Sequence, residues 1–169
     1  MPHPDPPHRG QDPVDFPATL FIICGLPGSG KTTLAKQIEG SLSAVRMSAD
    51  DWMSALCINL HAEEQRARIE ALQWELTKRL LSLQQNVVIE WGAWEKAERD
   101  GFRAAARSLG ARVELYYLSA PLEELFLRIQ QRNTEDPPIE WAEIQKWADI
   151  FEAPLPAEVM LFDAHSWVQ

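Results

Sequence analysis

A glycine-rich segment near the start of the chain has the residue types and spacing of a phosphate-binding loop. Residues 25–32 read Gly-Leu-Pro-Gly-Ser-Gly-Lys-Thr and fit the pattern G-x-x-x-x-G-K-[ST] at every fixed position. Glycine lets backbone N–H groups approach phosphate oxygens closely, because no side chain stands in the way. We expect a nucleotide to be bound by Gly25, Leu26, Pro27, Gly28, Ser29, Gly30, Lys31, Thr32 and Thr33.

Two side chains of this loop bring chemistry of their own. Lys31 is expected to reach the β and γ phosphates, and the Thr32 hydroxyl is expected to ligate Mg²⁺. The sequence has no N-K-x-D guanine signature, so ATP rather than GTP is the expected nucleotide. The loop alone does not define the reaction, since it serves ATPases, GTPases and small-molecule kinases. A glycine-rich turn without a ligand is the alternative.

Two adjacent carboxylates, Asp50 and Asp51, follow the short apolar segment 44–48. One of them can accept the proton of an acceptor hydroxyl while that oxygen attacks the γ-phosphate. We assign this general-base role to Asp50 and expect Asp51 to be the N-cap of the next helix, a common position for aspartate. The reverse assignment, or neither residue acting as base, remains open at this point.

A third carboxylate, Glu90, closes the apolar run 87–89. A carboxylate at the end of such a buried strand is typical of sites that order Mg²⁺ and its waters. The alternative is a structural carboxylate paired with a neighbour. Trp91 and Trp94 follow Glu90, and they either wall an acceptor pocket or fill the core.

Arg128 and Arg132 stand four residues apart, which places them on one face of a helix just before the polar loop 133–138. Guanidinium groups there suit a lid around residues 128–140 that closes on the transferring phosphate and neutralises its charge. The alternative is a surface face on which Arg128 pairs with Glu124.

Alternating strands and helices must position these residues. Apolar runs predict strands at 19–24, 44–48, 87–89, 113–118 and 159–162. Helical periodicity, with Pro121 as a starting residue and Gly110 as a C-terminal cap, predicts helices at 31–42, 62–85, 96–109, 122–132 and 140–151. The helix at 62–85 carries an apolar stripe formed by Ile69, Leu72, Leu76, Leu80 and Leu83. This α/β alternation predicts a mostly parallel sheet covered on both faces, with ligands beyond the carboxyl ends of its strands.

The glycine loop, residues 48–52, residues 88–90 and residues 124–133 together resemble the small P-loop kinases. The specific resemblance is to AAA-like ATP-binding proteins related to the kinase domain of polynucleotide kinase, and it spans most of residues 19–163. It implies a three-layer P-loop NTPase fold with a five-stranded sheet ordered 2-3-1-4-5 and a mobile lid. It also implies that the first aspartate of the pair, Asp50, is the base.

Two positions depart from the pattern of this family. Met53 stands where polynucleotide kinases have an arginine that contacts the reacting phosphate, which weakens the case for a polynucleotide substrate. Glu90 stands where related proteins more often have aspartate, so the charge is kept on a longer arm.

Composition limits the partners. The chain of 169 residues is 46% apolar, which fits one domain at 18–169, preceded at 1–17 by a proline-rich tail that we expect to be disordered. Its 25 acidic and 16 basic residues give a net charge of −9, which argues against nucleic acid and anionic membranes as partners. The two cysteines are too few for a disulfide framework, and without a signal peptide or an apolar span we expect a cytoplasmic protein.

These observations favour an enzyme that moves the γ-phosphoryl group of ATP to a hydroxyl of a small-molecule acceptor. Two alternatives stand beside it: a 5′-hydroxyl nucleic acid kinase, and a nucleotide-dependent switch that signals to a protein partner and has no acceptor. No particular protein partner is indicated. Residues 121–169 carry three basic and ten acidic side chains, which disfavours the nucleic acid kinase.

Overall fold

The computed structural model describes residues 17–132 and 137–168, and the proposed tail therefore lies almost wholly outside the described residues. A parallel five-stranded sheet forms its centre, in the order β2-β3-β1-β4-β5. Its strands are β1 (Thr19–Cys24), β2 (Val45–Met47), β3 (Val87–Gly92), β4 (Arg112–Leu118) and β5 (Ala164–Val168). This is the expected order 2-3-1-4-5.

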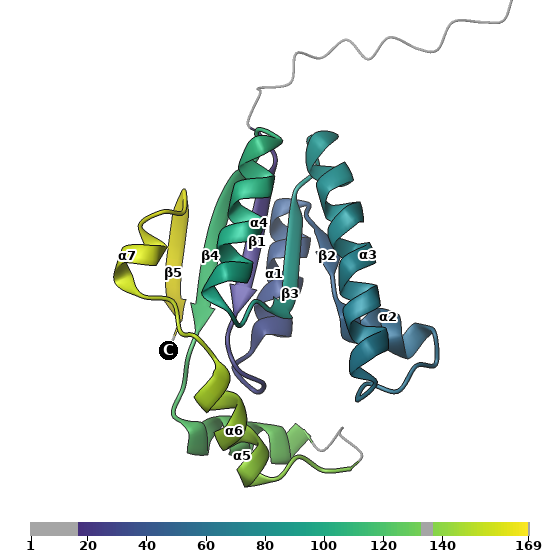
Figure 1. Ribbon diagram of the computed structural model, residues 1–169, viewed down its shortest axis with the longest axis vertical. Helices are drawn as coiled ribbons and strands as arrows, with labels where there is room; N and C mark the ends of the chain where they lie inside the picture. The colour runs from purple at the N-terminus through teal and green to yellow at the C-terminus, as the bar shows by residue number, and fades with distance from the viewer. Residues whose placement is uncertain (1–16, 133–136, 169) are drawn as a thin grey trace, which may run out of the picture.

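Helices cover both faces of the sheet (Figure 1). They are α1 (Lys31–Leu42), α2 (Ala49–Ala55), α3 (Glu63–Ser82), α4 (Lys96–Ser108), α5 (Leu122–Arg132), α6 (Trp141–Ile150) and α7 (Pro156–Val159). α3 and α4 lie on one face and α1 on the other, while α5 and α6 lie beyond the carboxyl ends of the strands (Figure 1). None of the helices in the described part of the chain is long and apolar enough to cross a membrane.

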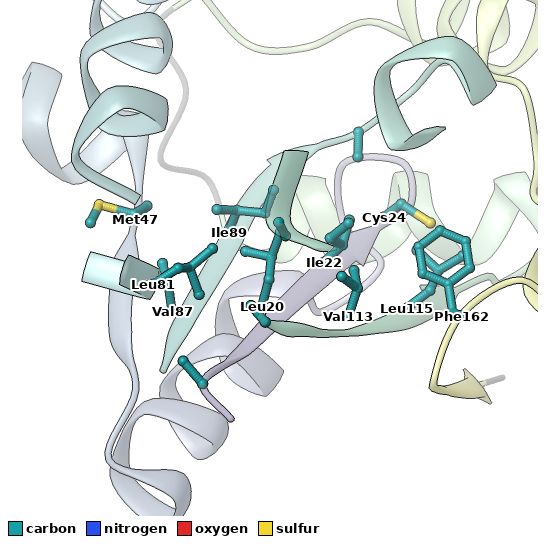
Figure 2. Packing of buried hydrophobic residues seen from close by; sticks show 14 of the residues in the cluster. Leu20, Ile22, Cys24, Met47, Leu81, Val87, Ile89, Val113, Leu115 and Phe162 are labelled. Carbon is teal, nitrogen blue, oxygen red and sulfur yellow. The ribbon is translucent and has the colours of Figure 1, made fainter. Parts of the chain in front are cut away.

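The central strand explains why the sheet is buried on both faces. Every residue of β1 is buried, as its unbroken apolar run predicts. Leu20 and Ile22 pack with Leu81 of α3 in the larger core cluster, as Figure 2 shows. Phe21 and Ile23 point the opposite way, into a second cluster with α1. The core therefore fixes the end of β1, where the glycine loop begins.

The predicted strand at 159–162 is wrong. Pro156 starts the short helix α7, a position that proline suits because it needs no N–H partner there. Val159 and Phe162 are buried because this helical turn presents them to the core. The real fifth strand, β5, has the mixed sequence Ala-His-Ser-Trp-Val and lies at the sheet edge, where no continuous apolar run is needed.

The apolar stripe predicted for α3 is wrong for three of its five residues. Leu72, Leu76 and Leu83 are exposed at 63%, 38% and 69%, whereas Ile69 is buried and Leu80 packs against the core. The buried face instead carries polar Gln73, whose amide hydrogen bonds are satisfied inside the fold. Its Nε2 donates to the Ser48 carbonyl at 3.0 Å, and its Oε1 accepts from the Trp91 indole at 2.6 Å.

Candidate active site

The glycine loop joins β1 to α1 in a conformation that only glycine adopts easily. Gly25, Gly28 and Gly30 have positive φ angles of 149°, 80° and 96°. A Cβ atom on Gly25 would lie 2.4 Å from the carbonyl oxygen of Leu118, so the loop also packs tightly against the end of β4. Gly30 is the N-cap of α1 and offers no side-chain cap, which leaves backbone N–H groups at the start of the helix for an anion.

A cavity of about 330 Å³ lies beside this loop. Six of the nine predicted nucleotide-binding residues line it, namely Pro27, Gly28, Gly30, Lys31, Thr32 and Thr33. Gly25, Leu26 and Ser29 are not among the lining residues; Leu26 and Ser29 are buried, and Leu26 belongs to the core cluster around α5 and α6. The predicted Asp50, Glu90, Arg128 and Arg132 line the same cavity. The fold thus brings every predicted catalytic and metal residue to one place.

Lys31 bridges the loop from inside. Its Nζ donates to the carbonyl oxygens of Gly25 at 2.9 Å and Leu26 at 3.0 Å. Burial lowers the pKa of Lys31 to about 8, while the carboxylates of Glu90 and Asp50 act in the opposite direction. A bound polyphosphate would add negative charge beside this ammonium group and favour its charged form.

The two aspartates have separate surroundings. Asp50 lies in the first turn of α2, and its Oδ1 accepts from Arg66 at 2.6 Å. Asp51 pairs with Arg46 and does not line the cavity. The expectation that Asp51 is the N-cap is wrong, because Ser48 is the cap and its hydroxyl accepts from the Asp51 N–H at 3.3 Å. A serine two residues before the pair competes for the same position, and that signal was available in the sequence.

Glu90 shows both of the properties that the sequence left as alternatives. Its Oε1 accepts from Arg46 at 2.6 Å, so it does pair with a neighbour. Its Oε2 is buried and has no hydrogen-bond partner among the residues that the structure describes. Burial raises the pKa of Glu90, and the nearby Ser48 hydroxyl and Arg46 lower it in part.

The donor set fits Mg²⁺. An unpartnered carboxylate oxygen of Glu90 and the hydroxyl of Thr32 line one cavity, and hard oxygen donors with room for waters and phosphates are what Mg²⁺ prefers. Groups of three or more His, Cys, Asp or Glu side chains with metal-site geometry are absent from the described residues. A Mg²⁺ ion beside Thr32 and Glu90 would need the nucleotide phosphates and water as its remaining ligands.

The two arginines of α5 line the same cavity beside the glycine loop as Glu90, and we refer to it below as the phosphate cavity. Arg128 pairs with Glu124, as the alternative interpretation expected, and its Nη1 also lies 3.5 Å from the carbonyl oxygen of Gly28. Arg132 lines the same cavity. An exposed ion pair such as Arg128–Glu124 contributes about 1 kcal/mol or less, so it does not hold Arg128 away from a phosphate. Residues 133–136 of the proposed lid lie outside the described residues.

A second cavity, of about 750 Å³, adjoins the first. Four residues line both cavities: Pro27, Asp50, Trp94 and Arg132. Trp94 lines both cavities and also packs on Phe151 in the cluster around α5 and α6, with ring centroids 6.2 Å apart. Trp91 likewise lines the phosphate cavity and packs on Phe102 in the core, with ring centroids 5.8 Å apart. Both tryptophans therefore combine a cavity wall with core packing, and whether the wall serves an acceptor stays a prediction.

Sequence reasoning missed two arginines that organise the carboxylates. Arg46 lies in β2 and contacts Glu39, Asp51 and Glu90. A cation inside the short apolar segment 44–48 was a usable signal for such a role. Arg66 lies in α3, sixteen residues after Asp50, and no spacing rule connects the two.

A third missed element is a buried ion pair below the site. Arg99 is fully buried and donates to both carboxylate oxygens of Glu158, at 2.6 and 3.1 Å. It also donates to the carbonyl oxygens of Ala93 and Trp94, at 2.8 and 3.2 Å. The pair thus fixes the segment that carries Trp94.

Comparisons with known proteins agree with this fold. A family model described as an AAA domain matches residues 20–154. No curated protein matches the chain. A gluconokinase from Sinorhizobium meliloti 1021 has a similar structure, with a TM-score of 0.59 and 18% identity over 90% of this chain and 83% of that one.

Two further structures give similar values. Kti12 of Chaetomium thermophilum, in complex with ADP-AlF3, has a TM-score of 0.67 and 21% identity over 88% of each chain. The APS kinase CysC of Mycobacterium tuberculosis, in complex with AMPPNP and APS, has a TM-score of 0.61 and 15% identity over 89% of this chain and 88% of that one. At such identities the likeness shows the fold. Because the family model matches most of its length, the chain belongs to the AAA domain family, with the fold of the P-loop kinases.

Proposed function

We propose that this protein is an ATP-dependent phosphotransferase that moves the γ-phosphoryl group to a hydroxyl of a small-molecule acceptor. One observation carries the proposal. Asp50 lies where the phosphate cavity meets the second cavity, so a hydroxyl held there would face the base on one side and the γ-phosphate on the other. A nucleotide switch without an acceptor has no use for such a junction.

Residues of the site can be assigned to each step of the phosphoryl transfer. Asp50 takes the hydroxyl proton; since Arg66 holds Oδ1, the proton goes to Oδ2. The acceptor oxygen then bonds to the γ-phosphorus, the bond from that phosphorus to the bridging oxygen breaks, and ADP leaves. Lys31, Arg128 and Arg132 neutralise the charge on the phosphoryl oxygens. Thr32 and Glu90 would hold Mg²⁺, which would supply further neutralisation of the phosphate charge.

Similar proteins support small-molecule transfer without deciding the acceptor. The gluconokinase and the APS kinase are named for small acceptors. In contrast, a chain of the Pnkp1/Rnl/Hen1 RNA repair complex also has a similar structure. Its TM-score is 0.68, with 22% identity over 85% of this chain and 44% of that one. Two free cysteines, Cys24 and Cys57, fit our placement of the enzyme in the cytoplasm.

Adjacent aspartates give a matched test. ADP release is measured over a panel of sugars, nucleosides and aminoglycosides, with oligonucleotides included. We expect Asp50→Asn to lower kcat by about 10²- to 10⁴-fold while ATP-analogue affinity is kept, because only the base is lost. Asp51→Asn, on the neighbouring residue outside the cavity, is the control and should retain most activity. Full activity in Asp50→Asn would remove Asp50 from the mechanism, and no acceptor-dependent ADP release at all would contradict the proposed function.

A further inference from the structure

The second cavity differs from the phosphate cavity in what lines it. Its volume of about 750 Å³ lies in the range that holds ring-sized organic ligands, and it is too large for a phosphate group alone. One wall comes from the segment that joins α2 to α3 and from the first turn of α3. Another part of the lining comes from α6. In Figure 1 these segments lie at the same end of the molecule, beyond the carboxyl ends of the strands.

The α6 wall is one face of a helix. The α6 residues that line the cavity are spaced by three, one and three positions, so their side chains lie on one side of the helix. They are Glu143, Lys146, Trp147 and Ile150. Ile144, the residue after Glu143, is fully buried in the cluster that packs α6 on α5, and Trp147 packs against the same cluster while it lines the cavity. Packing of α6 on α5 therefore holds this mixed face at the cavity.

Among the residues that the structure describes, the positive and negative charges around this cavity are balanced. Three carboxylates and three cations line it, Asp50, Glu63 and Glu143 against Arg66, Arg132 and Lys146. Several are already engaged within the protein. Arg66 pairs with Asp50, and a Glu143 side-chain oxygen accepts from the Glu140 N–H at 2.9 Å. A ligand with a large net charge would find as much repulsion as attraction here.

Apolar side chains also line this cavity and offer a ligand hydrophobic contact. Trp94 and Trp147 meet edge to face, with ring centroids 6.4 Å apart, and both line the cavity. Ile150 and Leu60 line it as well, although Ile150 is 54% exposed and Leu60 is 41% exposed. Apolar surface left open beside a cavity gains about 25 cal/mol per Å² when a ligand covers it. Aromatic rings favour contact with other ring systems.

We propose that this second cavity binds the acceptor, and that the acceptor is a ring-bearing alcohol without net charge, uncharged or zwitterionic, whose ring packs on the wall formed by Trp147, Trp94 and Ile150. The inference rests on the proposed function, because the hydroxyl of such a ligand would reach Asp50 at the junction of the two cavities. The same balance of charge disfavours sugar acids, aminoglycosides and the ends of nucleic acid strands.

The test measures binding separately from transfer. The full chain is saturated with a non-hydrolysable ATP analogue and titrated calorimetrically with ring-bearing probes that differ in charge. Uridine is compared with uridine 3′-monophosphate, and uncharged disaccharides and aromatic alcohols are compared with sugar acids and aminoglycosides. We expect the bound probes to be uncharged or zwitterionic ring alcohols, with affinities at least about tenfold above those of charged counterparts. Tighter binding of the charged members, or no binding by any ring alcohol without net charge, overturns the inference.

Matched variants assign the binding to this wall. Ile150→Asp places a charge on the apolar wall at an exposed position and should weaken binding by about tenfold or more. Leu127→Asp, an equally exposed aliphatic position on α5 that lines neither cavity, is its control. Trp147→Ala is compared with Trp141→Ala, which removes an indole from the same helix where it packs on Phe126. Equal effects within either pair overturn the inference.

The outcomes separate this inference from the proposed function. If a charged probe binds and is phosphorylated, the phosphotransferase stands and the acceptor class is wrong. If an uncharged ring alcohol binds, Ile150→Asp weakens it, and no phosphate is transferred, the cavity assignment stands and the proposed function fails.

Discussion

Arg66 is a positioning residue for the proposed base. Its guanidinium holds Oδ1 of Asp50 at 2.6 Å and the carbonyl oxygen of Leu60 at 3.1 Å, so it connects the base to one wall of the second cavity. We expect Arg66→Met to lower kcat by about 10- to 100-fold, with a smaller change in ATP-analogue affinity, because Asp50 loses its orientation. The change in kcat is measured by steady-state kinetics on the acceptor found in the screen, with kcat and KM determined separately.

A matched control lies two residues further along α3. Arg68 has the same side chain but is 75% exposed and pairs with Glu64 on its own helix. Arg68→Met should leave kcat within about twofold of the unchanged protein. If Arg66→Met and Arg68→Met behave alike, Arg66 does not position Asp50.

The raised pKa of Glu70 predicts that the stability of the fold depends on pH. Burial raises its pKa to about 7, with Arg66 opposing and Glu98 and Asp50 adding to the shift. Because the folded value lies above the unfolded value of about 4.5, this carboxyl group favours folding below pH 4.5 and loses that contribution as the pH rises to 7. Glu70→Gln should therefore raise the free energy of unfolding at pH 8, by up to about 3 kcal/mol, and not at pH 4.5.

Urea unfolding of Glu70→Gln at pH 4.5, 6 and 8 measures this difference. Glu64→Gln, at a side chain that is 76% exposed, is the control and should show no comparable gain between these pH values. A gain for Glu70→Gln that is equal at pH 4.5 and pH 8 would assign its effect to packing rather than to ionisation.

At the scale of single elements, the end of β3 depends on one glycine. Gly92 has a φ of 102°, and a Cβ atom there would lie 2.3 Å from Nε1 of Trp94. Gly92→Ala should therefore destabilise the fold by about 1–3 kcal/mol and displace the indole that lines both cavities. Urea unfolding and tryptophan fluorescence measure the two effects.

Gly101→Ala is the matched control for that substitution. Gly101 lies inside α4, and a Cβ atom there would meet nothing within 4 Å. Alanine at this helical position should stabilise the protein by about 0.5–1 kcal/mol. The two substitutions are thus expected to have opposite signs, and a stabilising effect of Gly92→Ala would show that the Trp94 segment is not held as described.

Elements with a strong local pattern could be predicted from the sequence, and elements that depend on tertiary context could not. The uniform apolar run of β1 and the glycine loop have local causes, so both were predicted correctly. α3 was predicted as a helix with the wrong buried face, because Gln73 is stabilised inside by Ser48 and Trp91, both distant in sequence. β5 was missed because pairing with β4 defines it more than its own residues do.

At the scale of the whole molecule, the site was predictable where strands end and unpredictable where distant helices meet. Asp50 follows β2, and Glu90 lies near the carboxyl end of the neighbouring parallel strand β3, so topology alone brings them together. The second cavity forms where residues 59–66 face α6, about eighty residues later in the chain. No local pattern encodes that meeting, which is why Arg66 and Trp147 were not among the expected residues.

The distribution of charge over the molecule links the two cavities to the acidic composition. Of the net charge of −9, residues 121–169 carry −7, from three basic and ten acidic side chains. All three basic residues of that region, Arg128, Arg132 and Lys146, line one or both cavities. Arg128 and Arg132 thus line the cavity where a nucleotide phosphate would lie, whereas Glu143 is the only carboxylate among the described residues of that region that lines either cavity. A long polyanion would meet the acidic exterior along most of its length, whereas a single nucleotide and a compact acceptor without net charge would meet only the interior.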